Sequence, residues 1–458
     1  SRERGDYFNM IFDYVIVGAG PAGLFAALRL VERKSKVKKK ILILEQGLPI
    51  DKRPRQETMK GVGGSGTFSD GKLHFTPVLS HEKLLDIFSV KHYQERVDKA
   101  DRWFSEFGAN GEYTPNNMDL AEKLVAECQR KGVYLYVRRC KHVGSDDLPK
   151  MIANMVSFLK KRGVKIKTET QVMEIMVRGK KVVGLKTDKG IVRAKKYIVC
   201  PGRIGAKWLQ DQARNIGLRY NYQKVEIGVR VEFPAGIMAE HSKIMHENIY
   251  SVQTKTYDDV IRTFCPCPNG FVAIEQYSDF LSVNGHSCNL RKTKSQNSNF
   301  DLCTEVVLTD PVENTLDYAI SIARLATTLG GGKPLIQRLA DLQKGRRSTW
   351  ARIGKSYVKP TLLEVTPGDI SMALPHRLVT SILEGLEKLD RVLPGINAGA
   401  TLLYAPEIKL RGNRIKINKK MQTEIKNLYM AGDGPGTSGN IVGAAASGIL
   451  AAEGALKI

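Results

Sequence analysis

The hydrophobic pattern near the N-terminus changes from that of a strand to that of a helix within a few residues. Residues 12–30 read FDYVIVGAGPAGLFAALRL, in which a β-branched run precedes Gly18-x-Gly20-x-x-Gly23 and alanines and leucines then recur at helical spacing. A second apolar run, ILILEQG at 41–47, ends in Glu45, 22 residues after Gly23. A strand, a tight glycine turn, a helix and a distal acid at this spacing predict a dinucleotide-binding βαβ unit.

Each glycine of this turn has its own predicted role. Gly18 allows the turn, Gly20 lets the backbone approach a pyrophosphate, and Gly23 brings the helix against the sheet. Phosphate charge would then face the helix N-terminus, and Glu45 would hold a ribose diol. Pro21 and Ala22 lie in the same turn and are assigned to the cofactor with these residues.

The C-terminal pattern identifies the dinucleotide as FAD. Residues 427–452, NLYMAGDGPGTSGNIVGAAASGILAA, predict a short strand, a glycine-rich turn at Gly432-Asp433 and a long helix of small residues. An acid at a strand end before a helix N-terminus suits the flavin half of FAD. We expect Asp433 on ribityl or phosphate oxygens, and the amides of Gly439 and Asn440 near flavin N1 and the C2 carbonyl.

Two further segments fit an FAD domain of the glutathione-reductase type. Residues 164–209 predict hairpins and a strand that ends in Pro201-Gly202-Arg203. In such domains the backbone at Val172 would meet the adenine, and Gly202 would form a turn beneath the cofactor. The run GVGGSGTFSDGKL at 61–73 has five glycines, which would let backbone lie along the cofactor. The FAD contacts assigned to this run are Gly63, Gly64, Ser65, Gly66 and Thr67, and the substrate-side residues are Ser69, Asp70 and Lys72.

Taken together, these segments make the chain resemble the bacterial and archaeal family of poorly characterised FAD-dependent dehydrogenases. The motifs that carry the resemblance are GVGGSGTFSDGKL, KHVGSDDLP (141–149), PGRIGAKWL (201–209), EIGVRVE (226–232), RTFCPCPNG (262–270), VNGHS (283–287), QRLADLQKGRRS (337–348) and the C-terminal turn. The last motif departs from the family, since GDGPGTSGNI stands where a run closer to GEGAGYAGGI is expected. Thr437 and Ser438 therefore leave the surroundings of the flavin edge open.

The predicted fold class is α/β, a discontinuous Rossmann-like FAD domain with an inserted α+β substrate domain. The FAD domain is expected at 8–75, 150–212 and 395–458, and the substrate or cap domain at 76–149 and 213–394. A complete second nucleotide domain is absent from the pattern. NAD(P)H, if it is the electron donor, would dock transiently at the flavin.

Candidate catalytic residues are few. His286 could deliver a proton while flavin N5 delivers hydride. Cys265 and Cys267, separated by one proline, could offer a thiolate beside the flavin. His74 and Tyr404 are further candidates. The eight histidines and seven cysteines spell no HExxH or zinc-like motif, so no metal is expected.

The net charge of the chain suggests two alternatives that involve RNA. Lys and Arg number 71 against 47 Asp and Glu, a net charge of +24 that could attract RNA or another polyanion. Segment 330–364 has eight basic and two acidic residues, with Trp350 and Tyr357 among them. From the FAD motifs we expect an oxidoreductase that moves hydride between a reduced partner and a small or medium organic substrate. The alternatives are a reductase of RNA pyrimidines and a flavin-bearing RNA-binding protein with little turnover.

Two features of the sequence predict a cytoplasmic protein. The longest apolar candidate, IVGAAASGIL at 441–450, is far shorter than a membrane span. The first ten residues lack the apolar core of a signal peptide. The oligomeric state is left open by the sequence.

Overall fold

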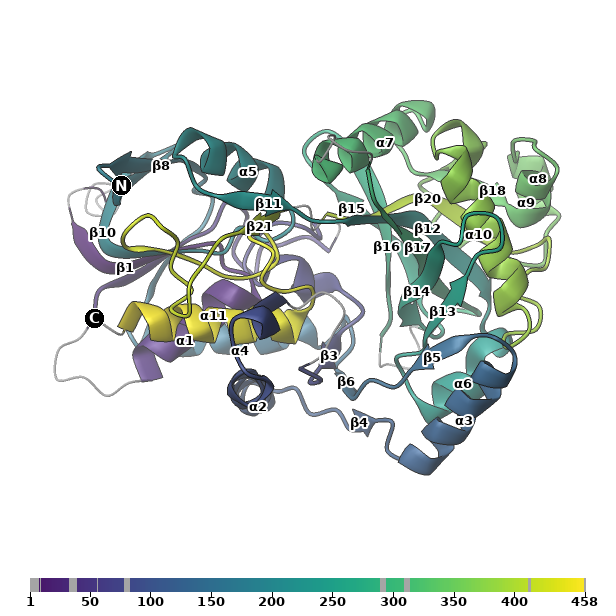
Figure 1. The fold of residues 1–458 in the computed structure, drawn as a ribbon, viewed down its shortest axis with the longest axis horizontal. Helices are drawn as coiled ribbons and strands as arrows, with labels where there is room; N and C mark the ends of the chain where they lie inside the picture. The colour runs from purple at the N-terminus through teal and green to yellow at the C-terminus, as the bar shows by residue number, and fades with distance from the viewer. Residues whose placement is uncertain are drawn as a thin grey trace.

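The computed structural model describes most of the chain, namely residues 8, 10–32, 39–55, 57–77, 83–288, 294–308, 314–410 and 413–456. Figure 1 shows two parts, one built around β1, α1 and α11 and the other around β12, β20 and α10. None of the described helices is long and apolar enough to cross a membrane.

The first part is a mostly parallel sheet in the order β7-β2-β1-β10-β9-β8, with β22 also paired to β10. Its strands are β1 (Ile11–Val17), β2 (Ile41–Leu44), β7 (Lys165–Lys167), β8 (Val172–Arg178), β9 (Lys181–Thr187), β10 (Gly190–Val199) and β22 (Leu428–Met430). β1 runs parallel to both β2 and β10, whereas β8, β9 and β10 form antiparallel hairpins. The central strands β1, β2 and β10 each end in consecutive apolar residues, because helices cover both faces of the sheet there.

Helices cover this sheet on its two faces. They are α1 (Pro21–Glu32), α2 (Val90–Glu106), α4 (Leu148–Lys161), α5 (Ala206–Asn215) and α11 (Ile441–Leu456). α1 and α11 share one hydrophobic core, and α5 packs in another on the opposite face. The two backbones of α1 and α11 come so close that a Cβ on Gly448 would lie 2.0 Å from the carbonyl oxygen of Ala22. The small residues of α11 are therefore required by packing.

The second part is an eight-stranded sheet in the order β19-β18-β20-β12-β17-β14-β13-β5. Its strands are β5 (Tyr134–Tyr136), β12 (Val225–Pro234), β13 (Ile249–Gln253), β14 (Val260–Cys267), β17 (Asn297–Val306), β18 (Leu335–Arg338), β19 (Thr366–Pro367) and β20 (Leu402–Lys409). All neighbours are antiparallel except β18 and β19. The helices of this part are α3 (Met118–Arg130), α6 (Ala239–Ile244), α7 (Thr315–Leu329), α8 (Leu339–Gln343), α9 (Trp350–Gly354) and α10 (His376–Leu389).

Small sheets and 3₁₀ turns complete the described structure. Two-stranded sheets pair β11 (Tyr220–Tyr222) with β21 (Asn413–Ile415) and β15 (Phe271–Gln276) with β16 (Leu281–His286); a three-stranded sheet joins β3 (Lys72–His74), β6 (Cys140–His142) and β4 (Tyr113–Thr114). The 3₁₀ turns are η2 (Gly64–Phe68), η3 (Lys83–Asp86), η4 (Ala235–Met238) and η6 (Ile370–Met372).

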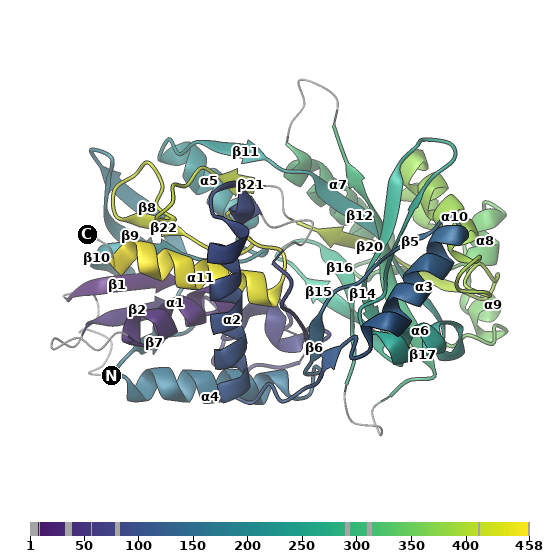
Figure 2. The same ribbon diagram turned by 60° about the horizontal axis from the view of Figure 1, so that its bottom comes forward.

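The α/β fold class agrees with the sequence prediction, but two predicted boundaries differ from the structure. β20 belongs to the second sheet, where it pairs with β12 and β18, and so the return to the first part comes after residue 409 instead of at 395. Residues 76–149 do not act as one insertion: α2 crosses α11 of the first part, as Figure 2 shows, whereas β5 joins the second sheet. Both differences arise from strand or helix pairing over long sequence separations.

A network of charged side chains lies inside the second sheet. Arg230 on β12 and Glu407 on β20 are fully buried and lie 3.3 Å apart, from Nη1 to Oε1. Lys409 Nζ lies 2.6 Å from Glu407 Oε1 and 3.4 Å from Asp301 Oδ2. Burial raises the pKa of Asp301 to about 7, with Glu407 adding to the shift and Lys409 and Arg230 opposing it.

This shift makes stability depend on pH. Because the pKa of Asp301 is raised on folding, the folded protein keeps a proton that the unfolded chain releases, and stability falls as pH rises between about 4 and about 7. Asp301→Asn removes this titration. Its free energy of unfolding, measured with urea, should decline less over this range than that of the parent.

Asp211→Asn is the control, because it removes a carboxylate that is 47% exposed on α5. It should retain the parental dependence on pH. Equal slopes for the parent, Asp211→Asn and Asp301→Asn would contradict the assignment.

Candidate functional site

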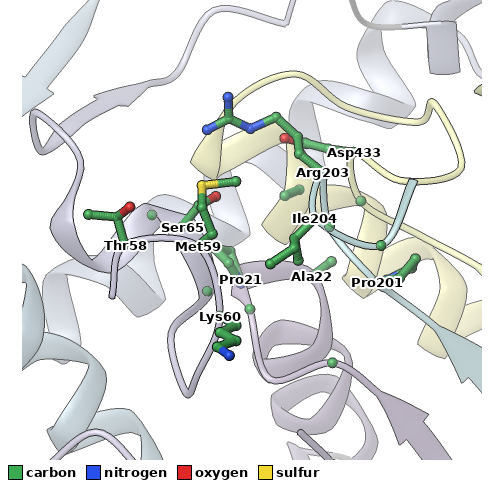
Figure 3. Close-up of a pocket in the computed structure, with 18 of the residues that line it drawn as sticks. Pro21, Ala22, Thr58, Met59, Lys60, Ser65, Pro201, Arg203, Ile204 and Asp433 are labelled. Carbon is green, nitrogen blue, oxygen red and sulfur yellow. The ribbon is translucent and has the colours of Figure 1, made fainter. Parts of the chain in front are cut away.

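A cavity of about 1070 Å³ opens between the carboxyl edge of the first sheet and the second part of the molecule. In Figure 3, Thr58 lies to the left of Pro21 and Ala22, and Arg203 and Asp433 lie above them. This volume is at the upper end of ligand pockets, roughly 300–1,000 Å³. The crevice at the carboxyl ends of parallel strands is where doubly wound folds bind their ligands.

The first glycine turn meets the cavity through Gly20. A Cβ on Gly18, which has φ +95°, would lie 2.2 Å from the carbonyl oxygen of Cys200, and one on Gly23 would lie 1.9 Å from that of Gly18. These two glycines are needed for backbone approaches within the protein. A Cβ on Gly20 would meet only the Cα of Gly64, at 3.8 Å, and so Gly20 leaves space free on the cavity side.

Glu45 lines the cavity but its carboxylate is largely occupied by backbone. Oε2 accepts the N–H of Ala19 at 2.9 Å, and Oε1 accepts those of Gly47 at 2.9 Å and Gly61 at 3.0 Å. A carboxylate offers about four lone-pair sites, so one acceptor site is left for a ligand hydroxyl. The carboxylate thus ties the first glycine turn to the glycine-rich loop, a role that the sequence pattern did not suggest.

The glycine-rich loop, defined here as residues 61–67, contributes part of the cavity wall. Gly64, Ser65 and Gly66 line the cavity, whereas Gly63 and Thr67 do not. A Cβ on Gly63 would lie 2.0 Å from the Thr67 hydroxyl, and one on Gly64 would lie 3.0 Å from the Cα of Gly20. The loop is rich in glycine chiefly because its backbone closes on other protein atoms.

The C-terminal turn forms the opposite wall. Gly432, at φ +85°, donates its N–H to Ser447 Oγ at 2.9 Å, and the Asp433 carboxylate accepts a hydrogen bond from the Ser438 hydroxyl. Asn440 Oδ1 accepts the N–H of Gly443 at 2.8 Å at the start of α11. The predicted cofactor residues that line the cavity are Gly18, Gly20, Pro21, Ala22, Glu45, Gly64, Ser65, Gly66, Val172, Gly202, Gly432, Asp433, Gly439 and Asn440. The structure thus brings together residues from the three separated segments that the sequence analysis assigned to FAD.

Most of the catalytic candidates lie away from this cavity. His286 does not line it: the ring stacks on Phe271 at 5.7 Å between centroids, and burial lowers its pKa. Tyr404 is also outside, buried with its hydroxyl on Glu232. Hairpin and sheet pairing direct these side chains into the protein.

The two cysteines are not thiolates. Cys265 lines the cavity, and burial raises the pKa of its thiol to about 11. Cys267 lies outside, with Sγ 3.2 Å from Arg230 Nη2, and burial raises its pKa to about 12 despite that guanidinium. Both thiols are therefore protonated at neutral pH, which disfavours the expected thiolate partner for the flavin.

Four of the titratable residues that line the cavity form an acid–base cluster, namely Asp70, Lys72, His74 and Glu247. Lys72 is 1% exposed, and its ammonium contacts Asp70 Oδ2 at 3.0 Å, the Glu247 carboxylate and the Pro266 carbonyl at 2.7 Å. His74 Nε2 lies 3.7 Å from Glu247 Oε1. Two carboxylates thus surround one ammonium and one imidazole.

The charge states in the acid–base cluster follow from burial and pairing. Burial opposes the charge of Lys72, but Asp70 and Glu247 outweigh it and raise its pKa; burial likewise opposes the charge of Asp70, but Lys72 lowers its pKa. For His74, burial lowers the pKa more than the Glu247 carboxylate raises it, so the imidazole is neutral at pH 7. Glu247 was missed by sequence reasoning because it stands far along the chain in no recognisable motif.

Sequence reasoning also missed Arg53, a cation close to the cavity. Arg53 is 7% exposed and does not line the cavity, yet its guanidinium donates to the carbonyls of Val62 and Gly64 at 3.0 and 2.9 Å. It also donates to Thr67 Oγ1 at 3.0 Å. Arg53 therefore sits behind the glycine-rich loop. Among the described residues, no group of three or more His, Cys, Asp or Glu side chains is arranged to hold a metal ion.

Solved structures of similar shape are distant in sequence. Glycine oxidase from Bacillus cereus is 15% identical with a TM-score of 0.41, covering 96% of this chain and 94% of its own. L-proline dehydrogenase from P. horikoshii is 12% identical with a TM-score of 0.43, covering 97% and 92%. Pyridoxine 4-oxidase from Mesorbium loti is 12% identical with a TM-score of 0.44, covering 96% and 98%. At these scores the likeness says nothing about the reaction of this chain.

One sequence relative and one family model also match the chain. An uncharacterized protein from Clostridium beijerinckii is 25% identical over 482 aligned positions, which cover 96% of this chain and 80% of that protein. Residues 224–410 match the family model described as FAD-dependent protein, C-terminal domain-like. This match confirms the resemblance to FAD-dependent proteins predicted from the sequence, and it supports FAD as the cofactor of the chain.

Proposed function

We propose that the protein is an FAD-dependent oxidoreductase that acts on a small or medium organic substrate in the part of the cavity facing the second sheet. The observation that carries this proposal is the single cavity, which joins the predicted FAD residues of three chain segments to the buried acid–base cluster. Bound FAD would supply hydride transfer.

The chain's own residues fit that cofactor. Gly20 leaves free space beside the N-terminus of α1, where a pyrophosphate suits the helix dipole. Glu45 keeps an acceptor site for a ribose hydroxyl, and Asp433 lies on the wall beside α11. These groups are spread along one cavity, as an extended dinucleotide requires.

Proton transfer is assigned to the acid–base cluster. A substrate that loses hydride from carbon must also lose a proton from nitrogen, oxygen or a neighbouring carbon. Neutral His74 can accept that proton, and Glu247, 3.7 Å from Nε2, would stabilise the imidazolium that results. In the opposite direction the imidazolium returns the proton as hydride enters the substrate.

The electron donor or acceptor is proposed to be a transient partner. Among the described residues, one parallel sheet has a glycine turn of the dinucleotide-binding type, and that turn is the one assigned to FAD. NAD(P)H, if used, would therefore have to enter the same cavity.

The alternative roles on RNA depend on segment 330–364. Trp350 is 48% exposed and Tyr357 69% exposed, as base stacking would need. However, Arg346 Nε already pairs with Asp341 at 2.8 Å, and no residue of the segment lines the cavity. We therefore favour the small-molecule substrate.

FAD retention tests the cofactor step. Purified protein should be yellow and release FAD, not FMN, on denaturation. Gly20→Val should fold but lose at least about 90% of its FAD, because the added side chain meets little protein and occupies the space of the pyrophosphate. Flavin content is measured by absorbance after denaturation, alongside the unfolding temperature.

The matched control is Gly354→Val, at an exposed glycine whose Cβ would meet nothing within 4 Å. It should retain FAD. A colourless parent that cannot be reconstituted with FAD, or normal FAD content in Gly20→Val, would rule out this cofactor site.

The acid–base assignment is tested by anaerobic bleaching of the flavin absorbance with a panel of amino acids, amines and 2-hydroxy acids. For a compound that bleaches it, the rate should be level above about pH 6.5 and decline at lower pH, because His74, whose pKa is lowered, must be neutral to accept a proton. His74→Asn should slow bleaching by about 10²- to 10⁴-fold.

His286→Asn separates this assignment from the one suggested by the sequence, since His286 lies outside the cavity. It should bleach at close to the parental rate. A large loss in His286→Asn with little change in His74→Asn would reverse the two roles.

RNA binding is tested by neutralising Arg346, Arg347 and Lys355 together. If the segment docks RNA, the slope of log affinity against log salt should flatten by roughly two to three, at about 0.7 to 0.9 per phosphate contact. FAD content should stay constant. If the parent has no RNA affinity, or if the salt slope is the same after the three substitutions, an RNA role for this surface is excluded.

A further inference from the structure

The side chain of Arg53 bonds almost entirely to backbone. Besides the carbonyls of Val62 and Gly64 and the hydroxyl of Thr67, its guanidinium donates to the carbonyls of Glu57 and Thr58, both at 3.0 Å. It thus joins the residues before the glycine-rich loop to both ends of the loop.

Among the described residues, the charge of Arg53 has no ion-pair partner. In the part of the chain that the structure describes, no carboxylate oxygen lies within 4.0 Å of its guanidinium, whereas Lys72, Arg203 and Lys409 at the same cavity all contact carboxylates. Burial lowers the pKa of Arg53 to about 10, with Glu45 and Glu57 opposing the shift from a greater distance. The group remains charged at neutral pH. The hydrogen bonds to carbonyls offset part of the cost of burying this charge, but no nearby anion offsets the rest.

The position of Arg53 shows where compensation could come from. A Cβ on Gly61 would lie 2.7 Å from Arg53 Cδ, so the side chain packs directly against the bare backbone of the loop. Gly61, Gly64, Ser65 and Gly66 line the cavity, whereas Arg53 does not. The loop is therefore a thin layer between the guanidinium and the space assigned to the cofactor, and the carbonyls that accept from Arg53 are drawn toward the side away from that space.

We propose that Arg53 is a positioning residue for the cofactor: it holds the glycine-rich loop in place as a cavity wall, and its unpaired charge favours an anionic group bound on the other side of the loop. This inference rests on the proposed function, because the anionic group is taken to be the pyrophosphate or the reduced flavin of FAD. The neighbouring Arg55 is exposed and has no such contacts to the loop.

Arg53→Met and Arg53→Lys test the proposal, with Arg55→Met as the matched control for charge and composition. The dissociation constant of FAD is measured by fluorescence on reconstituting the apoprotein, and the unfolding temperature of each apoprotein is measured separately. Arg53→Met should weaken FAD binding by about ten- to a hundredfold, because hydrogen bonds to a charged group are lost. Arg53→Lys, which keeps the charge but not the forked donors, should recover part of that loss, and Arg55→Met should match the parent.

Thr67→Val keeps the proposal testable if Arg53→Met does not fold. It removes one acceptor of Arg53 without changing the size of the side chain, and it should weaken FAD binding several-fold while the apoprotein unfolds near the parental temperature. Hydrogen exchange of residues 61–67 in the apoprotein should rise in Thr67→Val and stay parental in Arg55→Met.

The outcomes separate this inference from the proposed function. If the parent binds FAD and Arg53→Met or Thr67→Val binds it equally well, the positioning role is wrong and the cofactor assignment stands. A lower unfolding temperature with an unchanged FAD dissociation constant would also overturn it, since Arg53 would then only stabilise the fold. If the parent binds no FAD, the proposed function and this inference both fail.

Discussion

The close approach of bare backbone at the carboxyl edge of the first sheet is the constraint on which the rest of the structure depends. Gly18 sits against the Cys200 carbonyl, Gly64 against Gly20, and Gly434 against Pro201 and Gly202, at distances that exclude a side chain. Segments more than four hundred residues apart are thereby brought around one cavity. Because interiors are close-packed, a single methyl group at most of these points would push a wall out of place. The cavity is therefore a consequence of packing between turns.

Most of the buried charged side chains around the cavity are paired with an opposite charge. Lys72 lies between Asp70 and Glu247, Arg203 contacts Glu275, and Lys409 joins Glu407 to Asp301. These groups are almost fully buried, so each depends on its partner to offset the loss of water. Such pairing holds side chains in fixed positions without offering a strongly charged surface to the substrate. His74, neutral beside Glu247, is the member of this set that is suited to exchange a proton.

The second part of the molecule contributes charged side chains and one wall of the cavity, and it has no dinucleotide-binding turn among its described residues. Cys265 on β14, Lys409 on β20 and Asn284 on β16 line the cavity from this side. The residues of this part match the C-terminal domain of FAD-dependent proteins. The acid–base cluster draws on both sides of the cavity, because Asp70, Lys72 and His74 lie at β3 and Glu247 lies just before β13 of the second sheet.

The sequence by itself determined the dinucleotide turn, the distal Glu45, the C-terminal glycine turn and the α/β class, because each of these depends on local spacing and on the steric freedom of glycine. Most residues assigned to FAD do line one cavity. Only the tertiary structure decided that β20 joins the second sheet, that His286 and Cys267 lie outside the cavity, and that Glu247 lines it with Arg53 behind the glycine-rich loop. These outcomes depend on strand pairing and packing between residues that are far apart in the chain. The spacing of residues along the sequence does not show which distant side chains will be in contact.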